Sequence, residues 1–188
     1  SVVMGELNHW YNDVTEVARP MVNLMIVPNG NCGVSAENWL RQGSAVAKVA
    51  EILQDKCDVK ITASFFSKAA LTDNTNIINM VTLKDYHEDL DFRRLGAVTH
   101  PSFFRRVIFG CLENKGRSFG EAEVGWGYGR SVSSWEDLGL SSEEFQRASN
   151  TENVVLLPNA ESFRNMNDTI NIIKEAIYSA EKFIKGEE

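Results

Sequence analysis

The stretch that decides the fold is MVNLMIVPNGNCGVSAENWL, which runs from Met21 to Leu40. Its first seven residues are nearly all apolar, which is typical of a central strand covered on both faces. After the loop PNGNCGV, Ser35 is a good N-cap for a helix whose apolar residues recur at helical spacing to about Gln54. A buried strand, a small-residue loop and a helix predict one unit of an α/β protein, in which such loops usually bind ligands.

The remainder of the chain continues the alternation of strands and helices. Residues 58–66 and 76–84 have the pattern of strands, and the turn residues LTDNT between them predict a hairpin. Further helices are predicted at residues 90–98, 102–113, 141–148 and 167–185, and a last parallel strand at 153–157. We therefore expect a single three-layer, Rossmann-like α/β domain with a mixed, mostly parallel sheet and a C-terminal helix.

Length and composition are those of one domain. A chain of 188 residues with 43% hydrophobic residues can bury one ordinary core. We divide it into an N-terminal extension at residues 1–19 and an α/β domain at residues 20–188 with a long loop at 115–135. The apolar stretch LNHWYNDVTEV in the extension predicts a homo-oligomer, with Trp10 and Tyr11 in the contact between copies.

Charge and cysteine content indicate which classes of partner and which kind of cysteine to expect. With 19 Lys plus Arg against 26 Asp plus Glu, the formal net charge is -7, so any attraction for polyanions has to come from a local basic patch. The chain contains neither a long apolar stretch nor a segment that resembles a signal peptide, so we expect a soluble, cytoplasmic protein with no membrane partner. The widely spaced Cys32, Cys57 and Cys111 are typical of reduced, structural thiols.

The loop after the first strand carries no standard ligand motif. Gly30-Asn31-Cys32-Gly33 matches neither a dinucleotide fingerprint nor a phosphate loop. Asn29, Asn31 and Ser35 are neutral oxygen donors, which bind Mg²⁺ weakly without a carboxylate. We interpret the loop as a turn that caps the helix through Ser35, and a divalent-metal or nucleotide site there remains a reserve alternative.

Catalytic patterns are weak throughout the sequence. The three histidines, His9, His87 and His100, are far apart and none has a metal-type spacing. His100 precedes Pro101, where a capping or packing role is expected, and the acidic run at residues 87–91 is typical of a solvated loop. Ser35 and Cys32 have no base in any readable motif, so we expect a non-enzyme without a cofactor or metal.

Basic and aromatic residues gather in the second half of the chain. Arginine and lysine can contact phosphates while aromatic rings stack on bases, which is the pattern of single-strand recognition. The predicted nucleic-acid-binding residues are Arg105, Arg106, Lys115, Arg117, Phe119, Trp126, Tyr128 and Arg130. In the alternative interpretation, Phe103, Phe104 and Trp126 belong to the core and the arginines to a solvated helix face. Glu121 and Glu123 count against phosphate binding in the loop.

Three short motifs carry a resemblance to a known family. They are Val34-Ser35-Ala36, Arg41-Gln42-Gly43-Ser44 and His100-Pro101-Ser102-Phe103-Phe104-Arg105-Arg106. With them, residues 21–185 resemble a family of tailed-phage proteins described only as a domain of unknown function, with an α/β core. The chain is also similar to the phage single-stranded DNA-binding RNA polymerase cofactor Drc, although no binding motif of that protein can be matched residue by residue.

The resemblance implies a phage single-stranded DNA-binding protein that acts as a transcription accessory factor. Its partners would be single-stranded DNA and phage RNA polymerase, in the cytoplasm of an infected bacterial host cell. The alternative is a protein-interaction domain that works with a phage ATPase or polymerase without binding nucleic acid. The acidic balance favours this alternative, whereas the arginine and aromatic residues favour DNA binding.

Overall fold

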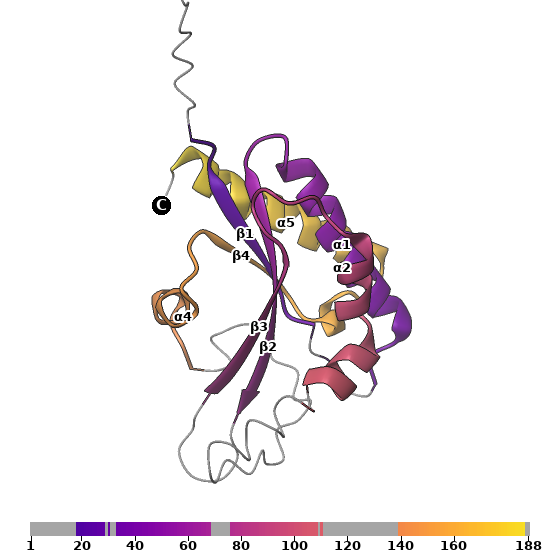
Figure 1. Ribbon diagram of the computed structural model, residues 1–188. Helices are drawn as coiled ribbons and strands as arrows, with labels where there is room; N and C mark the ends of the chain where they lie inside the picture. The colour runs from indigo at the N-terminus through magenta and orange to yellow at the C-terminus, as the bar shows by residue number, and fades with distance from the viewer. Residues whose placement is uncertain are drawn as a thin grey trace, which may run out of the picture.

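Four strands form one mixed sheet in the order β3-β2-β1-β4 (Figure 1). The computed structural model describes residues 18–28, 30, 33–68, 76–108, 110 and 139–186. The strands are β1 (Met21–Ile26), β2 (Asp58–Lys68), β3 (Asn76–Lys84) and β4 (Val154–Leu157). β1 pairs in parallel with both β2 and β4, while β2 and β3 are antiparallel, so the predicted hairpin is confirmed.

Helices lie on both faces of this sheet. They are α1 (Ala36–Leu53), α2 (Phe92–Val98), η1 (Phe103–Ile108), α4 (Ser142–Ser149), η3 (Ala160–Ser162) and α5 (Met166–Lys185). Figure 1 shows α1, α2 and α5 on one side of the sheet and α4 on the other. The expected α/β domain with a mostly parallel sheet and a C-terminal helix is confirmed. None of these helices is long and apolar enough to cross a membrane.

The central position of β1 follows from its side chains. Val22, Leu24 and Ile26 point into the core shared with α1 and α5, and Met25 packs on the opposite face beside Phe145 of α4. All residues of β1 except Met21 are buried. Each large apolar side chain buried in this way contributes about 1.5–3 kcal/mol. The predicted central strand, with the first and last long helices packed on it, is confirmed.

Two helices differ from the sequence-based expectation. The helix predicted at residues 90–98 begins at Phe92 because Asp91 is its N-cap, and the Asp91 carboxylate accepts a hydrogen bond from the Arg93 N–H at 2.9 Å. The helix predicted at residues 102–113 is a π-helix over Phe103–Ile108, a rare form that residue propensities do not reveal. Residues 111–113 lie outside the described part of the chain.

Cys57 is a free, buried thiol, as the cysteine spacing predicted, while Cys32 and Cys111 lie outside the described residues. Its Sγ donates to the Leu53 carbonyl at 3.4 Å. Burial raises the pKa of this thiol, and Asp58 adds to the effect while Arg19 and Lys56 oppose it.

The raised pKa of Cys57 predicts a pH-dependent stability. The folded state holds this proton more tightly than the unfolded state, so the contribution is fully present below about pH 8.5 and is lost as pH rises through the folded pKa. We expect the free energy of unfolding to fall between about pH 7 and about pH 10 more steeply in the wild type than in Cys57→Ala. Urea titrations at the two pH values measure this difference, and parallel pH profiles would contradict it.

Candidate functional site

The loop after β1 occupies the position where open α/β sheets bind ligands. From β1 the chain passes through α1 to β2 on one side, and β4 pairs with β1 on the other side. The carboxyl end of β1 is thus a topological switch point, and the crevice outside it is the usual ligand site. Of the loop residues singled out in the sequence, Asn29, Asn31 and Cys32 lie outside the described part of the chain.

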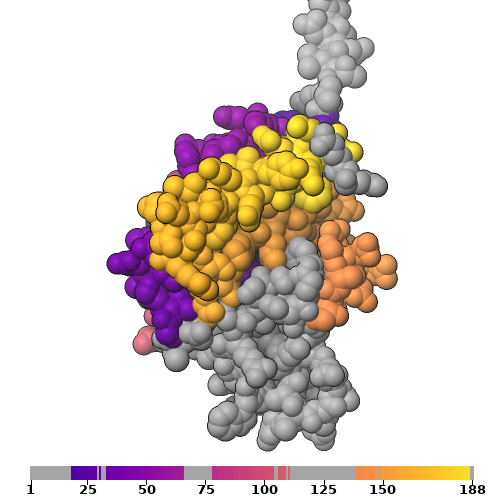
Figure 2. All heavy atoms as spheres, turned by 180° about the vertical axis from the view of Figure 1, so that it is seen from behind, coloured from indigo at the N-terminus to yellow at the C-terminus, as the bar shows by residue number. Residues whose placement is uncertain are grey.

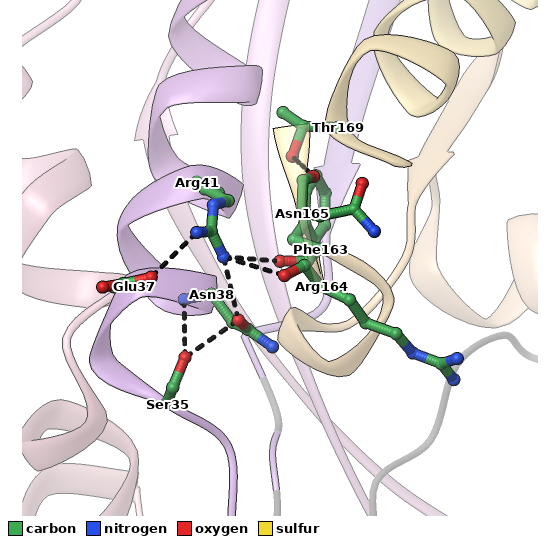
Figure 3. A network of polar contacts seen from close by, with 8 residues as sticks. All are labelled: Ser35, Glu37, Asn38, Arg41, Phe163, Arg164, Asn165 and Thr169. Carbon is green, nitrogen blue, oxygen red and sulfur yellow. Dashed lines mark hydrogen bonds and ion pairs between the residues drawn. The ribbon is translucent and has the colours of Figure 1, made fainter. Parts of the chain in front are cut away.

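The first turn of α1 is capped by the protein's own side chains (Figure 3). The Ser35 hydroxyl accepts a hydrogen bond from the Asn38 N–H at 3.3 Å and donates to the Asn38 Oδ1 at 2.9 Å. Arg41 donates to the same Oδ1 at 3.2 Å. The predicted capping role of Ser35 is confirmed, and its hydroxyl is engaged within the helix.

Arg41 also joins α1 to the segment that precedes α5. Its guanidinium donates to the carbonyls of Phe163 and Arg164 at 3.4 and 3.1 Å and pairs with Glu37 at 2.8 Å. In Figure 3 the Arg41 side chain reaches from α1 across to these two carbonyls. The arginine of the Arg41-Gln42-Gly43-Ser44 motif therefore has a structural role.

Gln42 bridges the segments that follow β1 and β4. Its fully buried side-chain amide donates to the Val27 carbonyl at 3.1 Å and to the Pro158 carbonyl at 2.8 Å. These carbonyls follow the carboxyl ends of two adjacent strands, so one side chain fixes both loops. The geometry supports a structural interpretation of this crevice.

Gly30 packs so closely on Trp39 that a larger residue does not fit. A Cβ at residue 30 would lie 2.6 Å from Cζ2 of the buried Trp39 ring. We expect Gly30→Ala to lower the free energy of unfolding by about 1–3 kcal/mol, because the large buried ring of Trp39 has to shift to admit the methyl group. Gly96→Ala is the control, since its Cβ meets nothing within 4 Å and alanine favours the helix. Equal urea midpoints for the two variants would contradict the expectation.

Only two of the eight predicted nucleic-acid-binding residues lie on a described element. Arg105 and Arg106 belong to η1, and Arg106 is exposed and forms no ion pair with any carboxylate in the described ranges. The side chain of Arg105 lies outside those ranges, as do Lys115, Arg117, Phe119, Trp126, Tyr128 and Arg130. The core interpretation of Phe103 is confirmed, because its ring packs 6.0 Å from that of Phe65.

Sequence reasoning missed a second arginine pair beside η1. Arg93 and Arg94 are exposed on α2, which contacts η1. They form exposed ion pairs with Asp91 and Glu88 at 3.3 to 4.0 Å, and such pairs stabilise a protein little. The sequence did contain a signal for this pair, because two consecutive arginines occur at Arg93-Arg94 just as they do at Arg105-Arg106. Backbone and side-chain hydrogen bonds from Arg93 lower the pKa of Asp91, so this carboxylate stays charged beside the arginines.

His100 lies between α2 and η1 and caps the backbone just before η1. Its Nδ1 accepts a hydrogen bond from the Ser102 N–H at 3.2 Å, which confirms the predicted capping role. The acidic run at residues 87–91 is used locally, with the Glu88 carboxylate accepting from the Asp85 N–H at 3.2 Å. Within the described ranges, no three His, Cys, Asp or Glu side chains are grouped as metal ligands.

A polar cleft of about 570 Å³ lies on the sheet face that carries α4, and no motif in the sequence pointed to it. Asn23 of β1 lines it and accepts a hydrogen bond from the Thr62 hydroxyl at 3.0 Å, while its Nδ2 has no partner among the described residues. The polar Asn23 within the apolar run of β1 was the available signal. An unpaired buried amide favours a polar occupant such as an ordered water.

The other walls of the cleft carry charges of both signs. Lys60 lies 3.7 Å from Asp85 and 5.7 Å from the centre of the Tyr86 ring. Burial raises the pKa of Tyr86, and Asp85 and Glu152 add to this effect. Because acidic residues surround the cations, the cleft offers no net positive site for phosphate.

These features define an α/β domain with a mixed sheet, in which Ser35 caps the helix that follows β1. Arginines are exposed on α2 and η1. The chain belongs to the family described as Domain of unknown function (DUF7192), whose model matches residues 2–181. The match includes the N-terminal extension together with the α/β domain. No curated protein and no solved structure matches the chain.

Proposed function

We propose that this protein binds single-stranded DNA through η1 and the arginine- and aromatic-rich segment at residues 115–135. In this proposal it is a binding protein without catalytic activity. The resemblance noted in the sequence supports a finer proposal, in which it is a phage transcription accessory factor that works with phage RNA polymerase in the cytoplasm of an infected bacterium.

The observation that carries the proposal is the exposure of Arg106. A guanidinium that faces solvent without a carboxylate partner in the described ranges is free to contact a phosphate. It lies on a π-helix, a form often found at functional sites. On the neighbouring α2, Arg93 and Arg94 are paired with Asp91 and Glu88, so they add no net positive charge. Residues 115–135 supply Trp126 and Tyr128 for base stacking in this proposal.

The net charge of -7 shapes how such binding would behave. Long-range attraction of DNA is absent, so affinity depends on a few direct phosphate contacts and on stacking. The phosphate contacts weaken as salt is added, whereas the affinity that comes from base stacking depends little on salt.

A labelled oligonucleotide titration at two salt concentrations tests the proposal. We expect single strands to bind at micromolar protein, more weakly at the higher salt, and duplex DNA of the same sequence to bind less well because its bases cannot stack on the protein. No change in anisotropy at micromolar protein would remove the proposal.

A protein-interaction domain is the second candidate, and the β4 edge of the sheet favours it. Within the described ranges no strand pairs with the outer side of β4, and an open edge can accept a strand from a partner. Beside it lies α5, the yellow helix of Figure 2. Tyr178 and part of Phe183 are exposed on this helix. Binding to a purified phage polymerase or ATPase, with no oligonucleotide binding, would support this candidate over the first.

The reserve candidate is a divalent-metal or nucleotide site in the loop after β1. The switch-point position favours it, whereas the capping by Ser35 and the bridge by Gln42 oppose it. Calorimetry with Mg²⁺ or with a nucleotide tests it, and measurable heat that saturates would support it.

A further inference from the structure

The polar cleft beside α4 has an unused hydrogen-bond donor in its wall. Asn23 lines the cleft and is only 1% exposed, and its Oδ1 is already occupied by the Thr62 hydroxyl at 3.0 Å. Its Nδ2 has no hydrogen-bond partner in the described part of the chain. Because a buried donor left unpaired costs free energy, this amide suits an occupant that brings an acceptor oxygen.

The walls around this amide are held by the sheet and by the turn that follows α4. Lys60 of β2 is the register partner of Asn23, so these two lining residues lie side by side on the sheet. Asn150 ends α4 with a left-handed backbone (φ 50°) and leads the chain toward β4. Asn153 then donates to the Met21 carbonyl at 3.0 Å, which fastens this turn to the start of β1. The cleft is therefore formed before any ligand binds, as small-molecule sites usually are.

The charged side chains that line the cleft carry both signs in equal number. They are Lys60, Arg147, Glu143 and Glu152. Lys60 is paired with Asp85 at 3.7 Å, whereas the other three are exposed and form no ion pair with any residue that the structure describes. One guanidinium and two carboxylates are thus available to a ligand.

This combination of groups selects against simple ions. An inorganic anion would accept from Asn23 and Arg147 but would face the carboxylates of Glu143 and Glu152. A simple cation would pair with the carboxylates but would leave the Asn23 amide without an acceptor. A small zwitterion satisfies both sets of groups at once.

We propose that this cleft binds a free α-amino acid. The ligand's carboxylate accepts hydrogen bonds from Asn23 Nδ2 and from the Arg147 guanidinium, whose planar fork matches a carboxylate. Its ammonium group pairs with Glu143 or Glu152. The volume of about 570 Å³ lies within the range of small-molecule sites. Because no residue of η1 lines the cleft, this binding does not depend on the proposed binding of DNA.

Calorimetric titration of the full chain with each of the twenty standard amino acids tests the proposal. We expect at least one to bind with a dissociation constant below about 1 mM. Its amide and its N-acetyl derivative should each bind at least about tenfold more weakly, because each lacks one of the two charges. Equal binding of either derivative, or no saturable heat with any of the twenty at about 10 mM, would overturn the proposal.

Two variants and one spectroscopic signal locate the binding. Arg147→Gln should weaken the affinity for that amino acid at least about tenfold, whereas Arg164→Gln, an exposed arginine that does not line the cleft, should bind as the wild type does. Both changes are on the surface, so both variants should fold. In the wild type, the side-chain amide signal of Asn23 in a ¹⁵N-resolved NMR spectrum should shift as the ligand saturates the site. An unchanged Asn23 signal, or equal affinities of the two variants, would overturn the proposal.

Discussion

Replacing Gln42 by leucine should lower the free energy of unfolding by about 2–4 kcal/mol, although leucine has a similar volume and suits a helix. The wild-type amide satisfies the carbonyls of Val27 and Pro158, at the ends of β1 and β4. Leucine leaves the buried Val27 carbonyl and the half-buried Pro158 carbonyl without this donor. A buried carbonyl left unsatisfied costs about 1–3 kcal/mol, and a half-buried one costs less because water can reach it. Urea unfolding followed by circular dichroism measures the change.

The control for this experiment is Gln54→Leu. Gln54 is exposed at the end of α1, so the same chemical change there should alter stability by less than about 0.5 kcal/mol. Equal stability of the two variants would mean that the Gln42 amide does not hold the two strand ends together.

Replacing Trp126 by alanine should weaken single-strand binding by about 1–3 kcal/mol, which is roughly 5- to 150-fold in affinity. The salt dependence should hardly change, because stacking releases few counterions. If the ring contacts bases and not the core, as proposed, thermal unfolding should also stay close to that of the wild type, since changes outside the core usually alter stability by less than about 0.5 kcal/mol.

Tyr178→Ala is the matched control, because Tyr178 is an exposed aromatic on α5. It should bind single strands as the wild type does. If Trp126→Ala instead unfolds the protein while the folded fraction binds normally, Trp126 belongs to the core and the stacking hypothesis is wrong.

The elements of the sheet were predictable because their signals are local. The apolar run of β1 is long enough to be recognised as a central strand, and the residues at 58–66 and 76–84 alternate as a hairpin does. Ser35 could be recognised as an N-cap because its hydroxyl acts within three residues.

The missed features depend on residues far apart in the chain. Gln42 looks like an ordinary polar residue of a helix, and only the neighbouring ends of β1 and β4 give its amide two carbonyl partners. The π-helix at η1, whose Phe103 ring lies against Phe65, could not be predicted because residue propensities do not distinguish it from an α-helix. An apolar groove between α1 and α2 likewise exists only once these two helices pack side by side.

The slope of log affinity against log salt for single-stranded DNA, measured for the wild type and Arg106→Ala, tests the proposed function most directly. Loss of one phosphate contact should weaken binding to all sequences alike and make the slope shallower by roughly 0.7. Lys174→Ala, which removes one positive charge from the exposed face of α5, should leave the slope unchanged. Equal slopes for the wild type and Arg106→Ala, or no binding by the wild type at micromolar protein, would contradict the account.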